Sequence, residues 1–257
     1  ISIAPDDRVR AFINVKDLTN EDYIHSNYII LCTKQGIIKK TALEAYSRPR
    51  ANGINAITIR EGDCLLEAAL TNGKSEMMLA TRKGKVCRFP EEKVRPMGRN
   101  ASGVIGIDLD DEGQDSNEVI GMICIQQPNA NVLVVSEHGY GKRSEVEEYR
   151  ITNRGGKGVK TINITEKTGN LVGIKSVTDK DDLMIITKNG IAIRLNVADL
   201  RLMGRATQGV RLINIQDDDA IAAVTQVERE DDEASETIPN NLNSSTDLNN
   251  TPSDHES

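Results

Sequence analysis

The sequence contains no tryptophan and only two phenylalanines and five tyrosines among 257 residues. Proteins that bind single-stranded DNA or RNA stack bases on aromatic side chains, so this scarcity argues against such a platform. No apolar run approaches the roughly 18 to 20 residues that a membrane helix needs, so we expect no membrane partner. The first residue is Ile1 and no signal-peptide pattern follows it. We therefore expect a processed chain or, better, a fragment of a longer protein.

Metal-binding spacing is also missing. Cys32, Cys64, Cys87 and Cys124 form no Cys-x-x-Cys pair, and the three histidines lie far from them in the sequence. Each cysteine sits in an apolar run, which is typical of a small buried thiol. We expect no disulfide, no metal site and no cofactor, and a reducing cytoplasmic location.

The net charge of −7 is unevenly distributed. Residues 228–257 hold nine acidic residues and one basic residue, whereas residues 1–227 hold 31 basic and 30 acidic residues. The acidic stretch is rich in Asn, Ser, Thr and Pro, and it cannot bury enough apolar surface to offset the entropy lost on ordering. We predict an ordered domain over 1–227 and a disordered acidic tail over 228–257.

An internal repeat organises the body. Each of four segments has an apolar run, a Thr or Ser, two further residues, a Gly, and a Lys or Arg four residues after that Gly. The segments are YIILCTKQGIIKKTALEAY (28–46), EMMLATRKGKVCRFPEEKV (76–94), NVLVVSEHGYGKRSEVEEY (131–149) and DLMIITKNGIAIRLNVADL (182–200). Their anchor glycines are Gly36, Gly84, Gly139 and Gly190. We expect each to supply the positive φ of a tight hairpin turn.

The second half of each unit repeats as well. A loop that ends in Gly precedes a β-branched run, beginning at Gly53, Gly103, Gly158 and Gly209. Acidic turns and a last apolar run follow, which gives about four short strands per unit. A period near 50 residues with four strands predicts an all-β, propeller-like array of stacked blades. Residues 1–15 match only a second half, so we expect four full blades and a partial one.

Basic and acidic residues fall in different parts of each repeat unit. The windows 34–50, 82–99, 139–160 and 188–211 contain 23 basic and 7 acidic residues, whereas the rest of the body contains 8 basic and 23 acidic residues. Because equivalent phases of a blade array lie at equivalent positions, the basic windows predict a continuous basic belt. Such a belt is the footprint of a polyanion. With few aromatics, duplex DNA contacted through its backbone is the better match.

One loop of this belt, TNRGGKGVKT (152–161), is unusually rich in Gly. A Walker A loop requires GxxxxGK[ST], but Val159 stands where the second Gly belongs and a β-branched strand follows instead of a helix. Nucleotide binding is therefore disfavoured. A simple turn would account for Gly158, which has a counterpart in every unit, but not for Gly155 and Gly156.

These motifs together resemble the C-terminal domain of the DNA gyrase A family. The resemblance covers residues 1–227 and rests on the TKxGxxxK/R turns, the MGRxxxGV segments (97–104 and 203–210) and the RGGKG loop. It implies a six-bladed β-pinwheel, a propeller whose blades exchange strands, that wraps duplex DNA around a basic rim to support negative supercoiling. It also implies two protein partners, the catalytic region of gyrase A and the separate ATPase subunit of the holoenzyme.

The family's diagnostic box is QRRGGKG on the first blade. Residues 154–158 match its last five positions, whereas Thr152 and Asn153 depart from its first two. The loop also falls on the penultimate blade, so it is either a secondary or a degenerate copy of the box. This leaves the corresponding C-terminal domain of topoisomerase IV as an alternative, and a protein-interaction propeller as another.

The resemblance and the belt together give a set of expected DNA-contacting residues. None is catalytic, and we expect this chain to be a non-catalytic part of a DNA topoisomerase. The set is Arg48, Arg50, Arg88, Arg95, Arg99, Arg143, Arg154, Gly155, Gly156, Lys157, Gly158, Arg194, Arg205 and Arg211.

Overall fold

Each anchor glycine of the repeat turns the chain between the two central strands of one antiparallel sheet. The computed structural model describes residues 7–109, 117–216 and 218–228. The four anchor glycines have φ between 75° and 86°, as predicted. In three turns a Thr hydroxyl accepts the N–H four residues further on, at 3.2 Å each. The four hairpins are β1–β2 (Tyr28–Thr33, Ile37–Ala42), β4–β5 (Glu76–Thr81, Lys85–Pro90), β8–β9 (Asn131–Ser136, Tyr140–Glu145) and β12–β13 (Asp181–Thr187, Ala192–Asn196).

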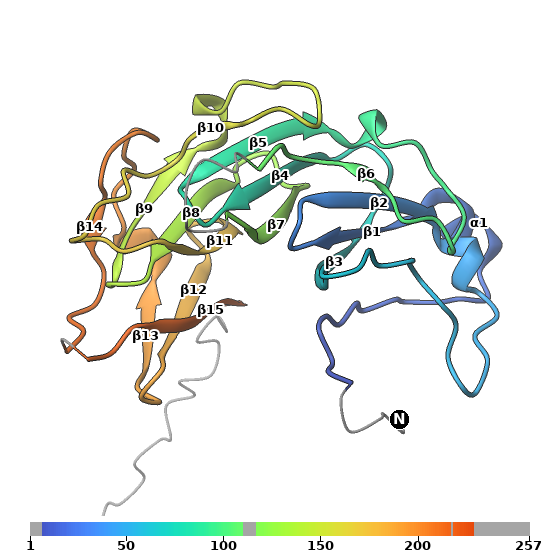
Figure 1. Ribbon diagram of the computed structural model, residues 1–257, viewed down its shortest axis with the longest axis horizontal. Helices are drawn as coiled ribbons and strands as arrows, with labels where there is room; N and C mark the ends of the chain where they lie inside the picture. Colours follow the sequence, from blue (N-terminus) through green and yellow to red (C-terminus); the bar gives the residue numbers. More distant parts are fainter. Residues whose placement is uncertain (1–6, 110–116, 217, 229–257) are drawn as a thin grey trace, which may run out of the picture.

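A third strand from the same unit pairs with the first strand of each hairpin. β7 lies between β3 and β11, and β11 contacts β15. The blades form an arc, and these third strands line its concave side (Figure 1). They are β3 (Leu65–Thr71), β7 (Val119–Ile125), β11 (Leu171–Val177) and β15 (Ile221–Glu228).

The fourth strand of a blade comes from the next unit along the chain. The two-residue strands β6 (Val104–Ile105), β10 (Val159–Lys160) and β14 (Val210–Arg211) pair with β2, β5 and β9 of the preceding hairpins. The sheet orders are therefore β3-β1-β2-β6, β10-β5-β4-β7, β11-β8-β9-β14 and β13-β12-β15. This confirms the all-β, propeller-like prediction, and the exchange links each blade to its neighbour.

The predicted partial blade forms no sheet in the part of it that the structure describes. Residues 7–20 contain no strand, and Ile13, Val15 and Leu18 pack instead against the outer face of the first blade. Residues 53–59, the counterpart of β6, also form no strand. Both segments lack a preceding hairpin among the described residues, and a single edge strand has no backbone partner without one. Of the predicted acidic tail (228–257), Glu228 is the last residue of β15, and the rest lies outside the described residues.

Short helices complete the fold. Helix α1 (Glu21–Ser26) precedes the first hairpin, and Asn20 caps it by accepting from the Tyr23 N–H at 2.9 Å. A 3-10 turn follows the second strand of each hairpin; these are η1 (Leu43–Tyr46), η2 (Glu91–Lys93), η3 (Val146–Glu148) and η4 (Val197–Asp199). In the described residues no helix is long and apolar enough to cross a membrane.

The apolar cores lie between blades. One core joins Ile30 and Ile38 of the first hairpin to Leu79 and Phe89 of the second, and two further cores join the second blade to the third and the third to the fourth. Because apolar groups cover both faces of the first three blades, the first strand of each of their hairpins is almost continuously buried. The four cysteines are free, with Cys32 and Cys87 fully buried and the other two partly buried.

Candidate nucleic-acid interface

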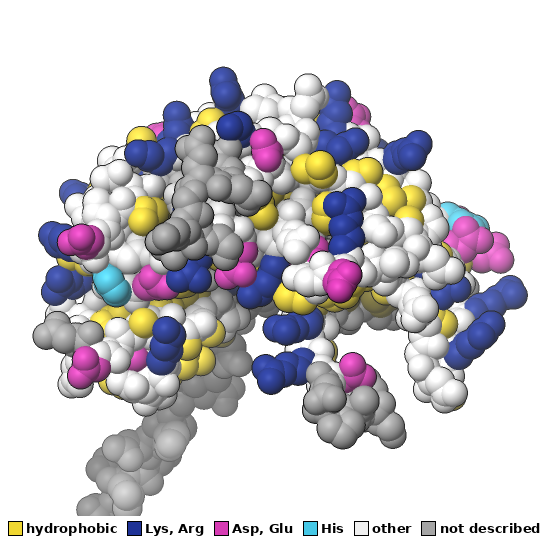
Figure 2. Space-filling view, in the orientation of Figure 1, with side chains coloured by type: hydrophobic (Ala, Val, Ile, Leu, Met, Phe, Trp, Pro, Cys, Tyr) yellow, Lys and Arg dark blue, Asp and Glu magenta, His cyan; other side chains and the backbone are white. Residues whose placement is uncertain are grey.

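The predicted basic loops lie on the outer edges of the blades. In the second, third and fourth units, the loop begins with a backbone N–H that donates to a carbonyl of the preceding hairpin's second strand, at 2.8 Å in each case. Each loop ends at the exchanged strand, so it bulges outward between two fixed points. Lys and Arg side chains stand along this convex edge (Figure 2). The three anchoring bonds run from Met97 to Lys40, from Thr152 to Arg88 and from Met203 to Arg143.

One arginine in each of these loops reaches back to the loop of the preceding unit. In every case Nη1 donates to the backbone carbonyl two residues after the glycine that ends that loop. A guanidinium carries five N–H donors, so most of them remain for an anion. The bonds are Arg99 to Asn55 (3.4 Å), Arg154 to Ile105 (3.0 Å) and Arg205 to Lys160 (2.8 Å). The three arginines are partly exposed and occupy equivalent points on the convex edge.

The RGGKG loop is fixed to its neighbours at several points. Arg154 Nε donates to the Lys93 carbonyl at 3.0 Å, and the Gly155 N–H donates to the Gly106 carbonyl at 2.7 Å. Gly155 and Gly158 have φ of 77° and 74°, a region that favours glycine. Gly156 has no positive φ, and a Cβ there would lie 3.7 Å from its nearest neighbour, the Asn153 carbonyl oxygen. The fold therefore does not require glycine at 156. The next residue, Lys157, is exposed.

This difference separates a folding role from a binding role within one loop. We expect Gly156→Ala to leave the thermal unfolding temperature within about 2 °C but to weaken duplex binding, because a methyl group hinders the approach of a phosphate to the backbone. Gly158→Ala is the contrasting variant, since its Cβ would lie 2.7 Å from the Val86 carbonyl oxygen. That variant should lose stability. Unchanged affinity in a folded Gly156→Ala protein would remove this loop from the DNA path.

Two further exposed arginines belong to this edge although the sequence pattern had not singled them out. Arg95, Arg150 and Arg201 each follow an anchor glycine by eleven residues, and all three are exposed. Only Arg95 was expected as a contact. The equal offset from the anchor glycine was the signal that could have identified Arg150 and Arg201. In the first unit the exposed Arg48 and Arg50 occupy the corresponding stretch.

Two expected contact residues are largely covered by other parts of the protein. Arg88 donates from Nη1 to the carbonyls of Val146 (2.6 Å) and Tyr149 (2.8 Å), and its Nε bonds Glu76 at 2.7 Å. Arg143 is 7% exposed and pairs with Asp179. Because both side chains are covered and engaged in these bonds, the structure favours the more accessible arginines as contacts.

Two expected contacts near the end of the array remain accessible. Arg194 is exposed, although its Nε pairs with Asp182 at 2.7 Å. Arg211 is exposed, and it donates to the Tyr140 hydroxyl at 3.0 Å.

The basic windows also contribute to an inner ion-pair network. Lys34 pairs with Glu118 at 3.0 Å, and Arg82 lies between Glu118 (4.0 Å) and Glu137 (3.4 Å). These residues line a cavity with Leu66, Val119 and Leu171 of the third strands. The basic belt is therefore narrower than the windows counted in the sequence. Lys34 and Arg82, which stand two residues before an anchor glycine, belong to this inner network and not to the belt.

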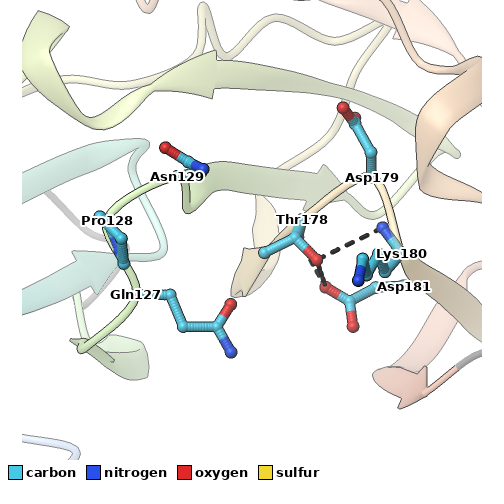
Figure 3. Close-up of a pocket in the computed structure, with 7 residues that line it drawn as sticks. All are labelled: Gln127, Pro128, Asn129, Thr178, Asp179, Lys180 and Asp181. Carbon is cyan, nitrogen blue, oxygen red and sulfur yellow. Dashed lines mark hydrogen bonds between the residues drawn. The ribbon is translucent and has the colours of Figure 1, made fainter.

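A cavity of about 580 Å³ opens between the β7–β8 and β11–β12 turns (Figure 3). Within it, the Asp181 carboxylate accepts from the Thr178 N–H at 2.6 Å and from the Thr178 hydroxyl at 2.8 Å. Nothing in this arrangement pairs a nucleophile with a base. Within the described ranges, no cluster of three or more His, Cys, Asp or Glu side chains is placed to hold a metal ion.

The repeat units coincide with matches to a known family model. The model for the DNA gyrase C-terminal domain, a beta-propeller, matches residues 27–72, 75–125, 130–178 and 181–228, one match per blade. The chain belongs to the DNA gyrase C-terminal domain family. DNA gyrase A of Staphylococcus aureus strain MRSA252 is 44% identical over 237 residues, 92% of this chain and 26% of that protein. The same protein of strain NCTC 8325 / PS 47 is 44% identical over 238 residues, with the same coverage.

The chain thus spans about a quarter of the length of the gyrase A proteins that it matches. Among solved structures, the C-terminal domain of DNA topoisomerase IV has a TM-score of 0.75 at 23% identity, covering 82% of this chain and 65% of that one. A DNA gyrase A C-terminal domain has a TM-score of 0.75 at 22% identity, covering 88% and 72%. These two likenesses establish the fold, and the family match confirms the β-pinwheel expected from the sequence.

Proposed function

We propose that this gyrase-family domain binds duplex DNA along the convex edge of its blades and wraps it, and so supports negative supercoiling by a complete gyrase. The observation that carries the proposal is the threefold repetition of Arg99, Arg154 and Arg205 with equivalent backbone contacts. A guanidinium at the equivalent position of three loops gives repeated sites for phosphates along a duplex. We assign the contact set to the accessible arginines and the RGGKG loop: Arg48, Arg50, Arg95, Arg99, Arg150, Arg154, Gly155, Gly156, Lys157, Gly158, Arg194, Arg201, Arg205 and Arg211.

The aromatic side chains favour a duplex over a single strand. Phe89, Tyr140 and Tyr149 are buried in the blades, and of the described aromatics only Phe12 is exposed, outside the basic loops. Base stacking is therefore not offered on the edge. Bending a duplex around the arc costs roughly 1 to 6 kcal/mol for 40–90° over a short site. Phosphate contacts at successive blades would offset that cost and make binding sensitive to salt.

The domain carries no cleavage chemistry in this proposal. Strand cleavage would belong to the catalytic region of gyrase A and ATP hydrolysis to the separate ATPase subunit, the expected partners in a cytoplasmic holoenzyme. Topoisomerase IV stays the alternative, since its C-terminal domain shares the fold. The sequence identity with gyrase A over 92% of the chain favours gyrase.

Binding and wrapping are tested together with the 257-residue chain. In gel-shift titrations at two salt concentrations we expect duplex DNA to bind more tightly than single strands of the same sequence. We also expect the affinity to fall steeply with salt and to depend weakly on sequence. Nicked circles religated on the protein should show a shift in linking number of one sign. Equal binding of both DNA forms, or no topological shift, would contradict the proposal.

A further inference from the structure

Two lysines are fully buried beneath the basic loops. Lys39 on β2 and Lys142 on β9 each follow an anchor glycine by three residues, and they are 0% and 1% exposed. Lys39 Nζ donates to the carbonyls of Ala56 (2.5 Å) and of Arg99. Lys142 Nζ donates to the Gly204 carbonyl (2.5 Å) and to the Thr207 hydroxyl (3.2 Å). Each ammonium is therefore bonded to the backbone of the loop that carries a rim arginine.

Among the residues that the structure describes, neither ammonium forms an ion pair with a carboxylate. Arg99 and the Tyr46 hydroxyl face Lys39, and Tyr46 shares the Ala56 carbonyl with it. Arg205 and Glu148 face Lys142, but the Glu148 carboxylate accepts from the Arg205 backbone N–H at 2.6 Å. Burying an ammonium that has hydrogen bonds but no counter-charge is costly, which points to a use for the charge beyond packing.

The loop between these two, which contains Arg154, has no buried lysine beneath it. At the equivalent position of the second hairpin stands Cys87, whose Sγ lies 3.7 Å from the Asn153 carbonyl oxygen and 3.6 Å from the Thr152 hydroxyl. This loop is RGGKG, which carries an extra exposed base, Lys157, and a second bond from Arg154. Where the buried charge is absent, the loop has more surface charge and more bonds of its own.

We propose that Lys39 and Lys142 are positioning residues of the DNA-binding edge: they hold the loops of Arg99 and Arg205 in place, and their buried positive charge attracts the phosphates above them. This inference rests on the proposed function. A charge that attracts the ligand is favoured by binding, so by linkage the affinity for DNA depends on whether these lysines are protonated.

The ionisation of both groups falls in an accessible range. Burial lowers the pKa of Lys39 to about 8, with the nearby Arg99 charge acting in the same direction. Burial also lowers the pKa of Lys142 to about 8; Glu148 opposes this shift and Arg205 adds to it. An unperturbed lysine titrates near ~10.4. Between pH 8 and that value the unfolded chain binds more protons than the folded chain, so each lysine raises the free energy of unfolding as the pH rises.

As the pH rises through about 8, the affinity for DNA should fall while the free energy of unfolding should rise. These opposite signs make a sharp test. The affinity of the full chain for a duplex oligonucleotide would be measured from about pH 7 to about pH 9 at constant salt, beside the Lys39→Met/Lys142→Met variant. We expect the chain to lose about three- to tenfold in affinity across this range, and the variant to show the lower affinity at every pH without the step. The Arg95→Met variant is the control, because it removes an arginine that stays charged across this range and keeps both buried lysines. This variant should bind DNA more weakly at every pH but show the same fall in affinity with pH as the chain.

Other ionisable groups near the blades also have shifted pKa values, so the comparison is made between the chain and its variant. Burial raises the pKa of the Cys32, Cys87 and Cys124 thiols. A hydrogen bond from Arg211 lowers the pKa of Tyr140 on the same strand as Lys142. All four are present in both proteins and cancel in the difference. Denaturant unfolding should show the chain gaining stability relative to the variant as the pH rises.

Each outcome decides one question. A parallel pH dependence of affinity in the chain and the variant overturns the inference while leaving DNA binding intact. No duplex binding by the chain at neutral pH defeats the proposed function itself. If the variant fails to fold, the chain alone remains informative: an affinity that stays flat across the same pH range contradicts a role for the buried charge.

Discussion

Replacing Arg99, Arg154 and Arg205 together with alanine should weaken duplex binding about a hundredfold at about 0.1 M salt and reduce the slope of log affinity against log salt by about 2 to 3. The slope changes because each lost phosphate contact no longer releases condensed counterions. The three side chains sit at equivalent points of the convex edge, so the loss should be similar for unrelated DNA sequences. Titrations at four or more salt concentrations measure both quantities.

A matched triple variant controls for net charge. Lys34, Arg82 and Lys188 each stand two residues before an anchor glycine, so they also repeat through the blades. Lys34 and Arg82 pair with Glu118 and Glu137 near the third strands instead of pointing from the outer loops. Their replacement with alanine removes the same three charges and should change the salt slope by less than one. An equal effect of the two triples would mean that overall charge, not the edge, governs binding.

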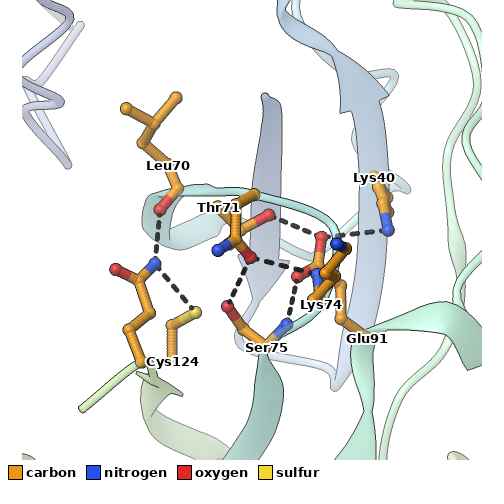
Figure 4. Close-up of polar contacts among 9 residues, drawn as sticks. Lys40, Leu70, Thr71, Lys74, Ser75, Glu91 and Cys124 are labelled. Carbon is orange, nitrogen blue, oxygen red and sulfur yellow. Dashed lines mark hydrogen bonds and ion pairs between the residues drawn. The ribbon is translucent and has the colours of Figure 1, made fainter. Parts of the chain in front are cut away.

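The largest effect on stability is expected at a buried ion pair between the first two blades. Lys40 Nζ lies 2.9 Å from Glu91 Oε1, with side chains 5% and 0% exposed. Thr71 and the Ser75 N–H also donate to the Glu91 carboxylate, at 2.5 and 3.1 Å (Figure 4). Glu91→Gln leaves the Lys40 ammonium buried without its counter-charge. We expect it to lower the free energy of unfolding by about 3 to 5 kcal/mol in denaturant titrations.

The exposed neighbour Glu92 offers the control, since Glu92→Gln should change stability by less than about 0.5 kcal/mol. A Lys40→Met/Glu91→Leu double variant removes both charges and should recover much of the loss, because no buried charge is then left alone. The equivalent junction of the next blade already lacks the pair: Arg88 there bonds the carbonyls of Val146 and Tyr149. If Glu91→Gln proves as stable as Glu92→Gln, the pair does not hold these blades together.

The sequence by itself determined the blades. Glycine is the residue that adopts positive φ without strain, so four equally placed glycines marked four hairpins, and the structure has them at Gly36, Gly84, Gly139 and Gly190. The apolar runs between them were too short for helices and too regular for loops. The concentration of basic residues in one phase of the repeat likewise followed from counting alone, because charge is a property of composition.

Only the tertiary structure decided which of those charges face solvent. Arg88 and Arg143 stand in the same kind of basic window as Arg99 and Arg205, yet they lie four residues after the glycine of a hairpin turn, where the next unit's loop covers the strand. That covering arises from strand exchange, a pairing between units about fifty residues apart. Burial depends on such distant partners, whereas turn geometry depends on neighbours in the chain. The repeat therefore predicted where charge gathers, and the exchange between blades determined that Lys39 and Lys142 lie beneath the edge while Arg95, Arg150 and Arg201 stand on it.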